Sequence, residues 1–187
     1  MQENKIVQTI RGHIENKMIL TIERKQLDNN EGITGFPLIL SDSLMMLLKI
    51  VDFRNEGFLI IRMEDITDAY SKKSDAFFEK ICIKEGLTEE TLENPIIDLT
   101  DFICVFKQLF NYNKFITVQC EEEDNELFYS IGKISKIEAN GIHFKNFDKM
   151  GVWEDDERII PINKISSVSF NDHYSNMYYK YMKPAFL

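Results

Sequence analysis

The sequence predicts an α+β fold that is mainly β: two tandem five-stranded small barrels, each with flanking helices, packed together. The first observation is an internal repeat, in which residues 60–69 match residues 159–168 in apolar pattern at a constant spacing of 99 residues. The second is a series of short apolar segments separated by clusters of Gly, Asn, Asp and Ser, which is typical of strands and turns. Turns absorb insertions far more easily than paired strands, so we interpret the repeat as a duplicated module with altered loops.

The first module is predicted to hold five strands, at residues 18–26, 33–40, 44–53, 58–63 and 66–70. Strands so short and so closely spaced predict a small barrel or a strongly bent sheet. Residues 5–13 are ambiguous between a short helix and a strand paired with residues 18–26. Residues 74–84 are predicted to be helical and to end before Gly86, which suits the left-handed position after a helix.

The second module is predicted to repeat this order, with strands at residues 115–120, 127–137, 142–147, 158–162 and 165–170. Asn140-Gly141 is a strong hairpin signal between the second and third of them. A last helix is expected at residues 174–182. Its aromatic stripe recurs in the first module, which indicates packing rather than a ligand site. The stripe consists of Tyr174, Met177, Tyr178 and Tyr181.

A further helix is expected at residues 98–111, capped by Asp98 or Thr100. Its apolar face is too wide for one small barrel to cover, so we expect it to lie between the two modules. The face consists of Phe102, Val105, Phe106, Leu109 and Phe110. These boundaries predict a first module at residues 1–86, an acidic linker at 87–97 and a second module at 98–187.

The run from Phe58 to Ile66 resembles the second sequence motif of the Sm-like (LSm) superfamily of small β-barrels: an apolar run, then Arg-Gly-Asn or Arg-Gly-Asp, then Ile. The resemblance implies tandem Sm-like or SH3-like barrels, and it implies RNA as a ligand. Only Arg62 matches the polar part, because Met63 and Glu64 replace the Gly-Asn step and the second copy has Pro161-Ile162-Asn163 there. We therefore expect the barrel without most of the RNA-reading surface.

The formal net charge of -9 disfavours nucleic acid as a partner, because an acidic surface repels phosphates and gives up counterion release. Acidic residues gather in two runs, at 121–124 and 154–157. We interpret the runs as solvated loop tips, with attraction of a basic protein as a sharper alternative. A calcium site is a further alternative, but the alternating Asp and Asn ligands and the central Gly of a calcium loop are missing.

No catalytic, cofactor or metal residue is predicted. Cys82, Cys104 and Cys120 are far apart, form no CxxC pair and are expected as buried thiols in a reducing cytoplasm. The three histidines are scattered: His13, His143 and His173. The first residues lack the features of a secretory signal, and no apolar run is long enough for a membrane helix, so we expect no membrane association.

The predicted function is a non-enzymatic cytoplasmic binding or adaptor protein that acts through protein–protein contacts at strand edges and loops. An Sm-type RNA-binding regulator and a small enzyme remain as alternatives. The expected partner is a protein, of basic character in the sharper interpretation, and a homo-oligomer is left open. The residues chosen as candidate contacts are Trp153, Arg62, Glu154, Asp155 and Asp156. Trp153 either anchors a partner or plugs the end of the barrel, and burial is favoured.

Overall fold

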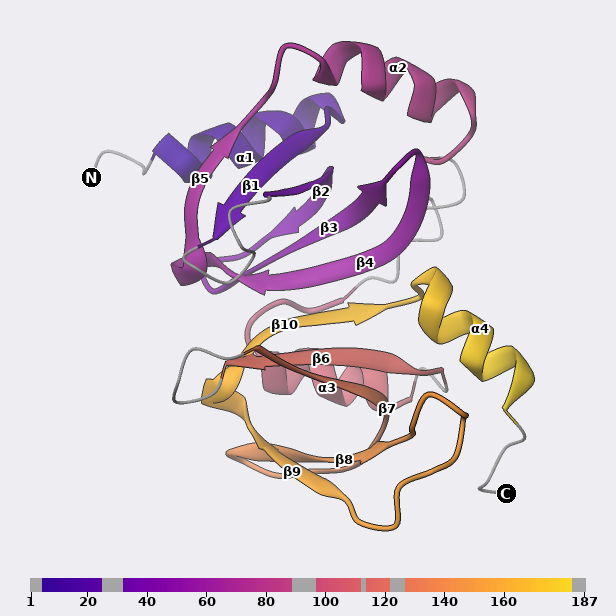
Figure 1. Ribbon diagram of the computed structural model, residues 1–187. Helices are drawn as coiled ribbons and strands as arrows, with labels where there is room; N and C mark the ends of the chain where they lie inside the picture. The colour runs from indigo at the N-terminus through magenta and orange to yellow at the C-terminus, as the bar shows by residue number, and fades with distance from the viewer. Residues whose placement is uncertain (1–4, 25–31, 89–96, 112–113, 122–126, 183–187) are drawn as a thin grey trace.

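The computed structural model describes residues 5–24, 32–88, 97–111, 114–121 and 127–182 (Figure 1). Its helices are α1 (Lys5–Asn16), α2 (Asp75–Lys84), α3 (Phe102–Phe110) and α4 (His173–Tyr181). The strands of the first half are β1 (Leu20–Arg24), β2 (Ile33–Leu40), β3 (Leu44–Val51), β4 (Arg54–Arg62) and β5 (Ile66–Tyr70). Those of the second half are β6 (Ile116–Glu121), β7 (Leu127–Ile137), β8 (Gly141–Asn146), β9 (Arg158–Pro161) and β10 (Ile165–Phe170).

All ten strands belong to one antiparallel sheet in the order β5-β1-β2-β3-β4-β10-β6-β7-β8-β9. Figure 1 shows the halves one above the other, with β4 and β10 facing each other between them. The prediction of two closed barrels is therefore wrong. Closure would require β4 to pair with β5 of its own half, but β4 pairs instead with β10, which opens both halves into one continuous sheet.

The two halves share the same strand order and the same local irregularities, as the repeat predicts. A 3-10 turn at Met63–Asp65 joins β4 to β5, and a second at Ile162–Lys164 joins β9 to β10. The residues before these turns have nearly equal backbone angles, with φ -73° and ψ 137° at Arg62 and φ -65° and ψ 135° at Pro161. Each turn is followed by a bulge, between Ile66 and Asp68 and between Ile165 and Ser167.

Two predicted boundaries and one alignment are wrong by small shifts. The turn between β3 and β4 lies at Asp52 and Phe53, both with positive φ, so β4 begins at Arg54 rather than Phe58. Upstream of residue 60 the sequence repeat shortens to a spacing of 97 residues, which aligns Ile19 with Ile116 and Gly35 with Gly132. In the structure, Ile116 pairs with Gly132, and the residue that pairs with Gly35 is Leu20. Leu20, and not Ile19, is therefore the counterpart of Ile116.

The helices resolve what the sequence left open. Residues 5–16 form α1, because its apolar residues follow helical spacing and Ile10 is fully buried. Helix α3 is capped by Asp101, whose carboxylate accepts the backbone N–H of Cys104 at 2.7 Å. Asp98, one of the two predicted caps, instead accepts the N–H and hydroxyl of the other, Thr100, in the preceding turn.

Two apolar clusters form the core. The smaller lies between α1 and the first-half sheet, and the larger contains buried residues of both halves. Helix α3 contributes Phe102, Val105, Phe106 and Leu109 to the larger cluster, as the predicted apolar face requires, while Phe110 is 47% exposed; the helix itself lies in the second half beside β7 (Figure 1). The predicted linker at 87–97 falls largely outside the described residues, although Leu87 and Ile97 pack on this cluster. Within the described part of the chain, no helix is long and apolar enough to span a membrane.

Candidate protein-interaction surfaces

The junction between β4 and β10 shows how this chain joins two sheet edges. Ile60 pairs with Val168 and Phe58 pairs with Phe170, and the two phenyl rings stack with centroids 5.1 Å apart. Ile60 and Val168 are both 0% exposed. Apolar cross-strand pairs of this kind add side-chain packing to the backbone ladder, so the halves share one core at their seam.

Arg62, one of the predicted contact residues, lies within this junction. Its Nε donates to the carbonyl of Ile165 at 2.7 Å and its Nη2 donates to the carbonyl of Ile162 at 2.6 Å. The guanidinium also lies 4.9 Å from the ring centre of Phe102 and 3.5 Å from the carboxylate of Glu64. These contacts attach the end of β4 to the second half and leave only 21% of the Arg62 side chain exposed.

Trp153 lies in the segment between β8 and β9. Its side chain is half-buried, so it is neither the exposed anchor nor the fully buried plug that the sequence offered as alternatives. It forms an isolated bridge with Phe147, and its ring meets Phe115 and Phe147 edge to face at centroid distances of 5.5 and 5.7 Å. Phe115 in turn meets Tyr179 of α4 edge to face at 5.3 Å. Trp153 therefore belongs to an aromatic cluster that attaches α4 to the end of the second half.

Glu154, Asp155 and Asp156 are exposed and follow Trp153 directly. Glu154 is held by Asn146, whose Nδ2 donates to the Glu154 carboxylate at 3.3 Å, and Lys145 donates to the backbone carbonyl of Asp155 at 2.7 Å. The structure thus places four of the five chosen residues on one segment, and Arg62 at the inter-half junction. Most of the other acidic run, at 122–124, lies outside the described residues.

Large apolar side chains around this segment and α4 form a surface that the sequence analysis missed. We call them the α4 surface: Tyr129, Met150, Val152, Tyr174, Met177 and Tyr181, of which Met150 is 82% and Tyr181 70% exposed. The predicted packing role of the helical stripe is thus wrong for Tyr174, Met177 and Tyr181. The spacing shows correctly that they share a helix face, but not whether another element covers that face.

A hollow of about 350 Å³ opens beside the α4 surface. Its walls are largely apolar and come from β6, β7, the segment after β8 and α4. They consist of Thr117, Tyr129, Ile131, Phe147, Asp148, Lys149 and Tyr174. The rim is held in place by Tyr178, whose hydroxyl donates to the carbonyl of Lys149 at 2.9 Å and whose ring lies 4.9 Å from that of Phe147.

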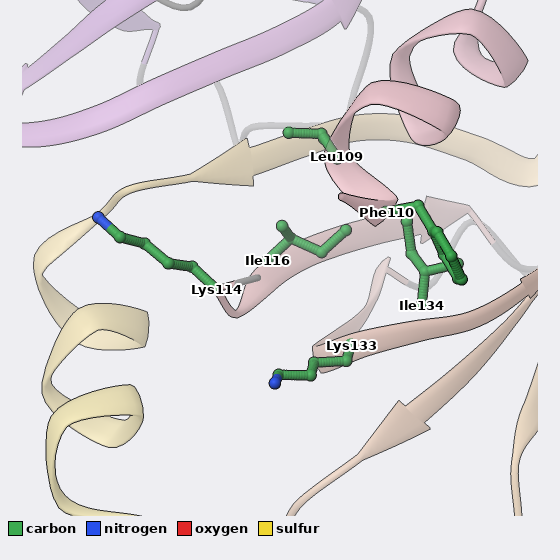
Figure 2. A pocket seen from close by; sticks show the side chains of 6 residues that line it. All are labelled: Leu109, Phe110, Lys114, Ile116, Lys133 and Ile134. Atoms are coloured by element: carbon green, nitrogen blue, oxygen red, sulfur yellow. The ribbon is translucent and has the colours of Figure 1, made fainter. Parts of the chain in front are cut away.

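A second hollow, of about 50 Å³, lies between the end of α3 and β6 and β7 (Figure 2). Two lysines are among its lining residues, but both ammonium groups have other contacts. Lys114 points toward the chain that enters α4 and donates to Asn171 at 3.1 Å, whereas Lys133 lies 5.6 Å from the ring centre of Phe115. With room for one or two water molecules, the hollow is too small for an organic ligand.

One Ser–His pair has the spacing of a nucleophile and its base. His13 Nε2 lies 2.7 Å from Ser71 Oγ, and His13 Nδ1 lies 2.8 Å from the carbonyl of Thr9. Neither of the two hollows includes this pair, so it has no substrate pocket there, and its evident effect is to attach α1 to the end of β5. Among the described residues, no group of three or more His, Cys, Asp or Glu side chains could hold a metal ion.

Two of the three cysteines have a thiol whose pKa is raised. Cys82 and Cys120 are buried and Cys104 is half-buried, all as free thiols. Burial raises the pKa of the Cys82 thiol, which suppresses the reactive thiolate. The pKa of the Cys104 thiol is also raised, first by burial and then by the neighbouring Asp101.

Comparison of the chain with protein-family models, with curated proteins and with solved structures finds no match in any of the three. The resemblance to Sm-like barrels thus remains a sequence-based prediction. What stands is an α+β chain with a single open antiparallel sheet of ten strands.

Proposed function

We propose that this chain is a non-enzymatic binding protein that acts through protein–protein contacts, with the α4 surface as the docking site for a basic segment carrying a bulky apolar side chain. The observation that carries the proposal is an apolar hollow of about 350 Å³ whose wall includes the exposed Tyr129 and Tyr174, with further exposed apolar side chains on α4 and on the segment after β8. Exposed apolar surface of this kind is typical of interaction sites.

The site is suited to binding because its walls are already in place. The aromatic cluster and the hydrogen bond from Tyr178 to Lys149 hold α4 against the segment after β8. A partner would therefore not have to order these groups, and the conformational entropy lost on binding would be small. Tyr129 and Tyr174 offer rigid amphipathic rings, a residue type enriched among interface hot spots.

Charge supports a basic partner. The chain carries a net charge of -9, and Glu154, Asp155, Asp156 and Glu157 are all exposed beside the aromatic cluster. Glu154 donates its backbone N–H to Asn146 next to Phe147, so the acidic run begins at the wall of the hollow. Acidic groups at a rim accelerate encounter with a basic segment, and added salt weakens that effect.

The test is selection of a displayed random-peptide library on the immobilised protein. Enriched peptides should combine Lys or Arg with a bulky apolar residue and should lose binding to the Tyr129→Ala and Tyr174→Ala variants. Phe77→Ala is the matched control, because Phe77 is an aromatic residue on α2 that is 70% exposed and lies outside the α4 surface. Enrichment of acidic peptides, or equal binding by all three variants, would contradict the proposal.

A further inference from the structure

The Ser–His pair at the end of β5 joins a buried imidazole to an exposed serine. His13 belongs to α1, which packs against β2 and β5 (Figure 1), and the residue is only 9% exposed. Ser71 follows directly after β5 and is exposed. The two residues are 58 positions apart in the sequence, yet the fold brings His13 Nε2 to 2.7 Å from Ser71 Oγ. A hydroxyl at the surface is thus in contact with a base that is held from within.

The other ring nitrogen of His13 decides which group donates in this contact. Nδ1 lies 2.8 Å from the backbone carbonyl of Thr9, one turn earlier on the same helix. A carbonyl oxygen can only accept a hydrogen bond, and a neutral imidazole carries a single N–H. That N–H is therefore at Nδ1, and Nε2 holds a lone pair. Ser71 must then donate its hydroxyl proton to Nε2.

This arrangement is that of a serine nucleophile with a general base. An imidazole that accepts the hydroxyl proton activates the serine oxygen for attack. A third group that accepts the remaining ring N–H fixes the tautomer and the orientation of the ring. The carbonyl of Thr9 is that third group, and the helix holds it in place. His13 is therefore bonded at both nitrogens and needs no rearrangement before it takes up a proton.

The charges next to Ser71 favour the same chemistry. Lys72 and Lys73 follow it directly, and both are exposed. Positive charge beside a nucleophile stabilises the negative charge that develops on a carbonyl oxygen during attack. The next carboxylate along the chain, Asp75, is buried and accepts the backbone N–H of Lys72 at 2.6 Å. It therefore does not offset this positive charge at the surface.

The second half lacks the pair although it repeats the fold. Tyr70 and Ser169 occupy equivalent positions, because each pairs with the second residue of the first strand of its own half. The residue that follows is Ser71 in the first half and the fully buried Phe170 in the second. Helix α3, which precedes the first strand of the second half, contains no histidine. The folding unit thus forms without a Ser–His bond, and attachment of a helix does not require one.

We propose that Ser71 is an acylation site, at which its hydroxyl attacks an activated acyl ester with His13 as the general base. Ser71 Oγ bonds to the carbonyl carbon of the ester while the hydroxyl proton passes to His13 Nε2. The bond from that carbon to the leaving oxygen then breaks, and the leaving oxygen takes the proton from Nε2. The products are acyl-Ser71 and the free alcohol or phenol, with His13 neutral again. The site lies at the end of β5 and not on the α4 surface, so it goes beyond the proposed function.

Acetylation of the full chain by 4-nitrophenyl acetate at pH 8 tests the proposal, with peptide mass spectrometry as the readout. Trypsin cleaves after Lys72 and Lys73, so Ser71 and Ser74 are found on separate peptides, residues 63–72 and 74–80. Ser74 is the matched internal control, because it is exposed in the same connection and its hydroxyl does not cap α2. A positioned general base accelerates a reaction about 10²–10⁴-fold, so Ser71 should be acetylated at least about a hundred times faster than Ser74. Fragment ions distinguish Ser71 from Tyr70.

Two substitutions separate the nucleophile from its base. Ser71→Ala should remove the fast acetylation of peptide 63–72, and His13→Gln should lower the Ser71 rate toward that of Ser74. In urea the ratio of the two rates should fall to about one, because unfolding separates His13 from Ser71. This unfolded baseline keeps a variant that fails to fold from being mistaken for one that has lost only its base. Equal rates at Ser71 and Ser74 in the folded protein, or an unchanged Ser71 rate in folded His13→Gln, would overturn the proposal.

Discussion

Replacing Phe106 of α3 with Ala should destabilise both halves of the molecule in one step. Phe106 is 0% exposed and belongs to the apolar cluster that contains buried residues of both halves. Truncating a fully buried Phe typically costs about 3–5 kcal/mol, because it removes apolar contacts and leaves a cavity. With a urea dependence of about 2 kcal/mol per molar, this loss lowers the unfolding midpoint by roughly 2 M.

Three probes native to the chain can follow each half separately. Trp153 fluorescence reports the second half, because Trp153 packs against Phe115 and Phe147. Alkylation of the buried thiols, measured by mass spectrometry of peptides, reports the first half through Cys82 and the second half through Cys120. For Phe106→Ala, all three probes should show the same lowered midpoint.

Phe110→Ala is the matched control, because it lies on the same helix and its side chain is 47% exposed. Its midpoint should fall by much less. The reasoning would be refuted if Cys82 became reactive at an unchanged urea concentration in Phe106→Ala while the second-half probes shifted. That result would mean that the halves unfold independently and do not share a core.

Three further outcomes are expected. Gly132→Ala should destabilise the protein in the same urea titration, because φ at Gly132 is +154° and an added Cβ would lie 1.9 Å from the carbonyl oxygen of Lys145. Gly12→Ala on α1 should instead stabilise the protein by up to about 1 kcal/mol, because an added Cβ there meets nothing within 4 Å. The hydrogen bond to Glu23 and, to a lesser extent, burial raise the pKa of Tyr70. The difference in free energy of unfolding between the unchanged protein and Tyr70→Phe should therefore be constant below about pH 10 and should decline as pH rises through the raised pKa. A difference that stays constant at alkaline pH would contradict this. Filter binding with uridine-rich and mixed RNA oligonucleotides at physiological salt should detect no affinity, because the net charge is -9, and micromolar binding would favour the RNA-binding alternative.

Much of the fold was predictable because it depends on local patterns. The alternation of apolar residues and the turn residues between them located all ten strands, and the repeat between residues 60–69 and 159–168 predicted two copies of one unit. The helical spacing of Phe102, Phe106 and Leu109 predicted a helix with a buried face. These features depend on the periodicity of side chains along one segment, and periodicity is visible in the sequence.

The candidate sites were less predictable because exposure depends on distant segments. Arg62 was chosen from a motif, but the carbonyls that it meets belong to residues a hundred positions later. The stripe of Tyr174, Met177 and Tyr181 was correctly placed on one helix face, but the structure leaves that face open. A pattern of apolar residues shows that they lie together and does not show what covers them.

The sequence by itself determined the ten strands, their order and the repeat of the unit, because these follow from side-chain periodicity and turn chemistry over a few residues. Only the tertiary structure decided which edges meet. Strands β4 and β9 are equivalent in sequence pattern, yet Ile60 is buried by β10 and Ile159 remains exposed. The difference arises because a strand edge can pair with any suitable edge within reach, and reach is set by the whole chain rather than by the strand itself.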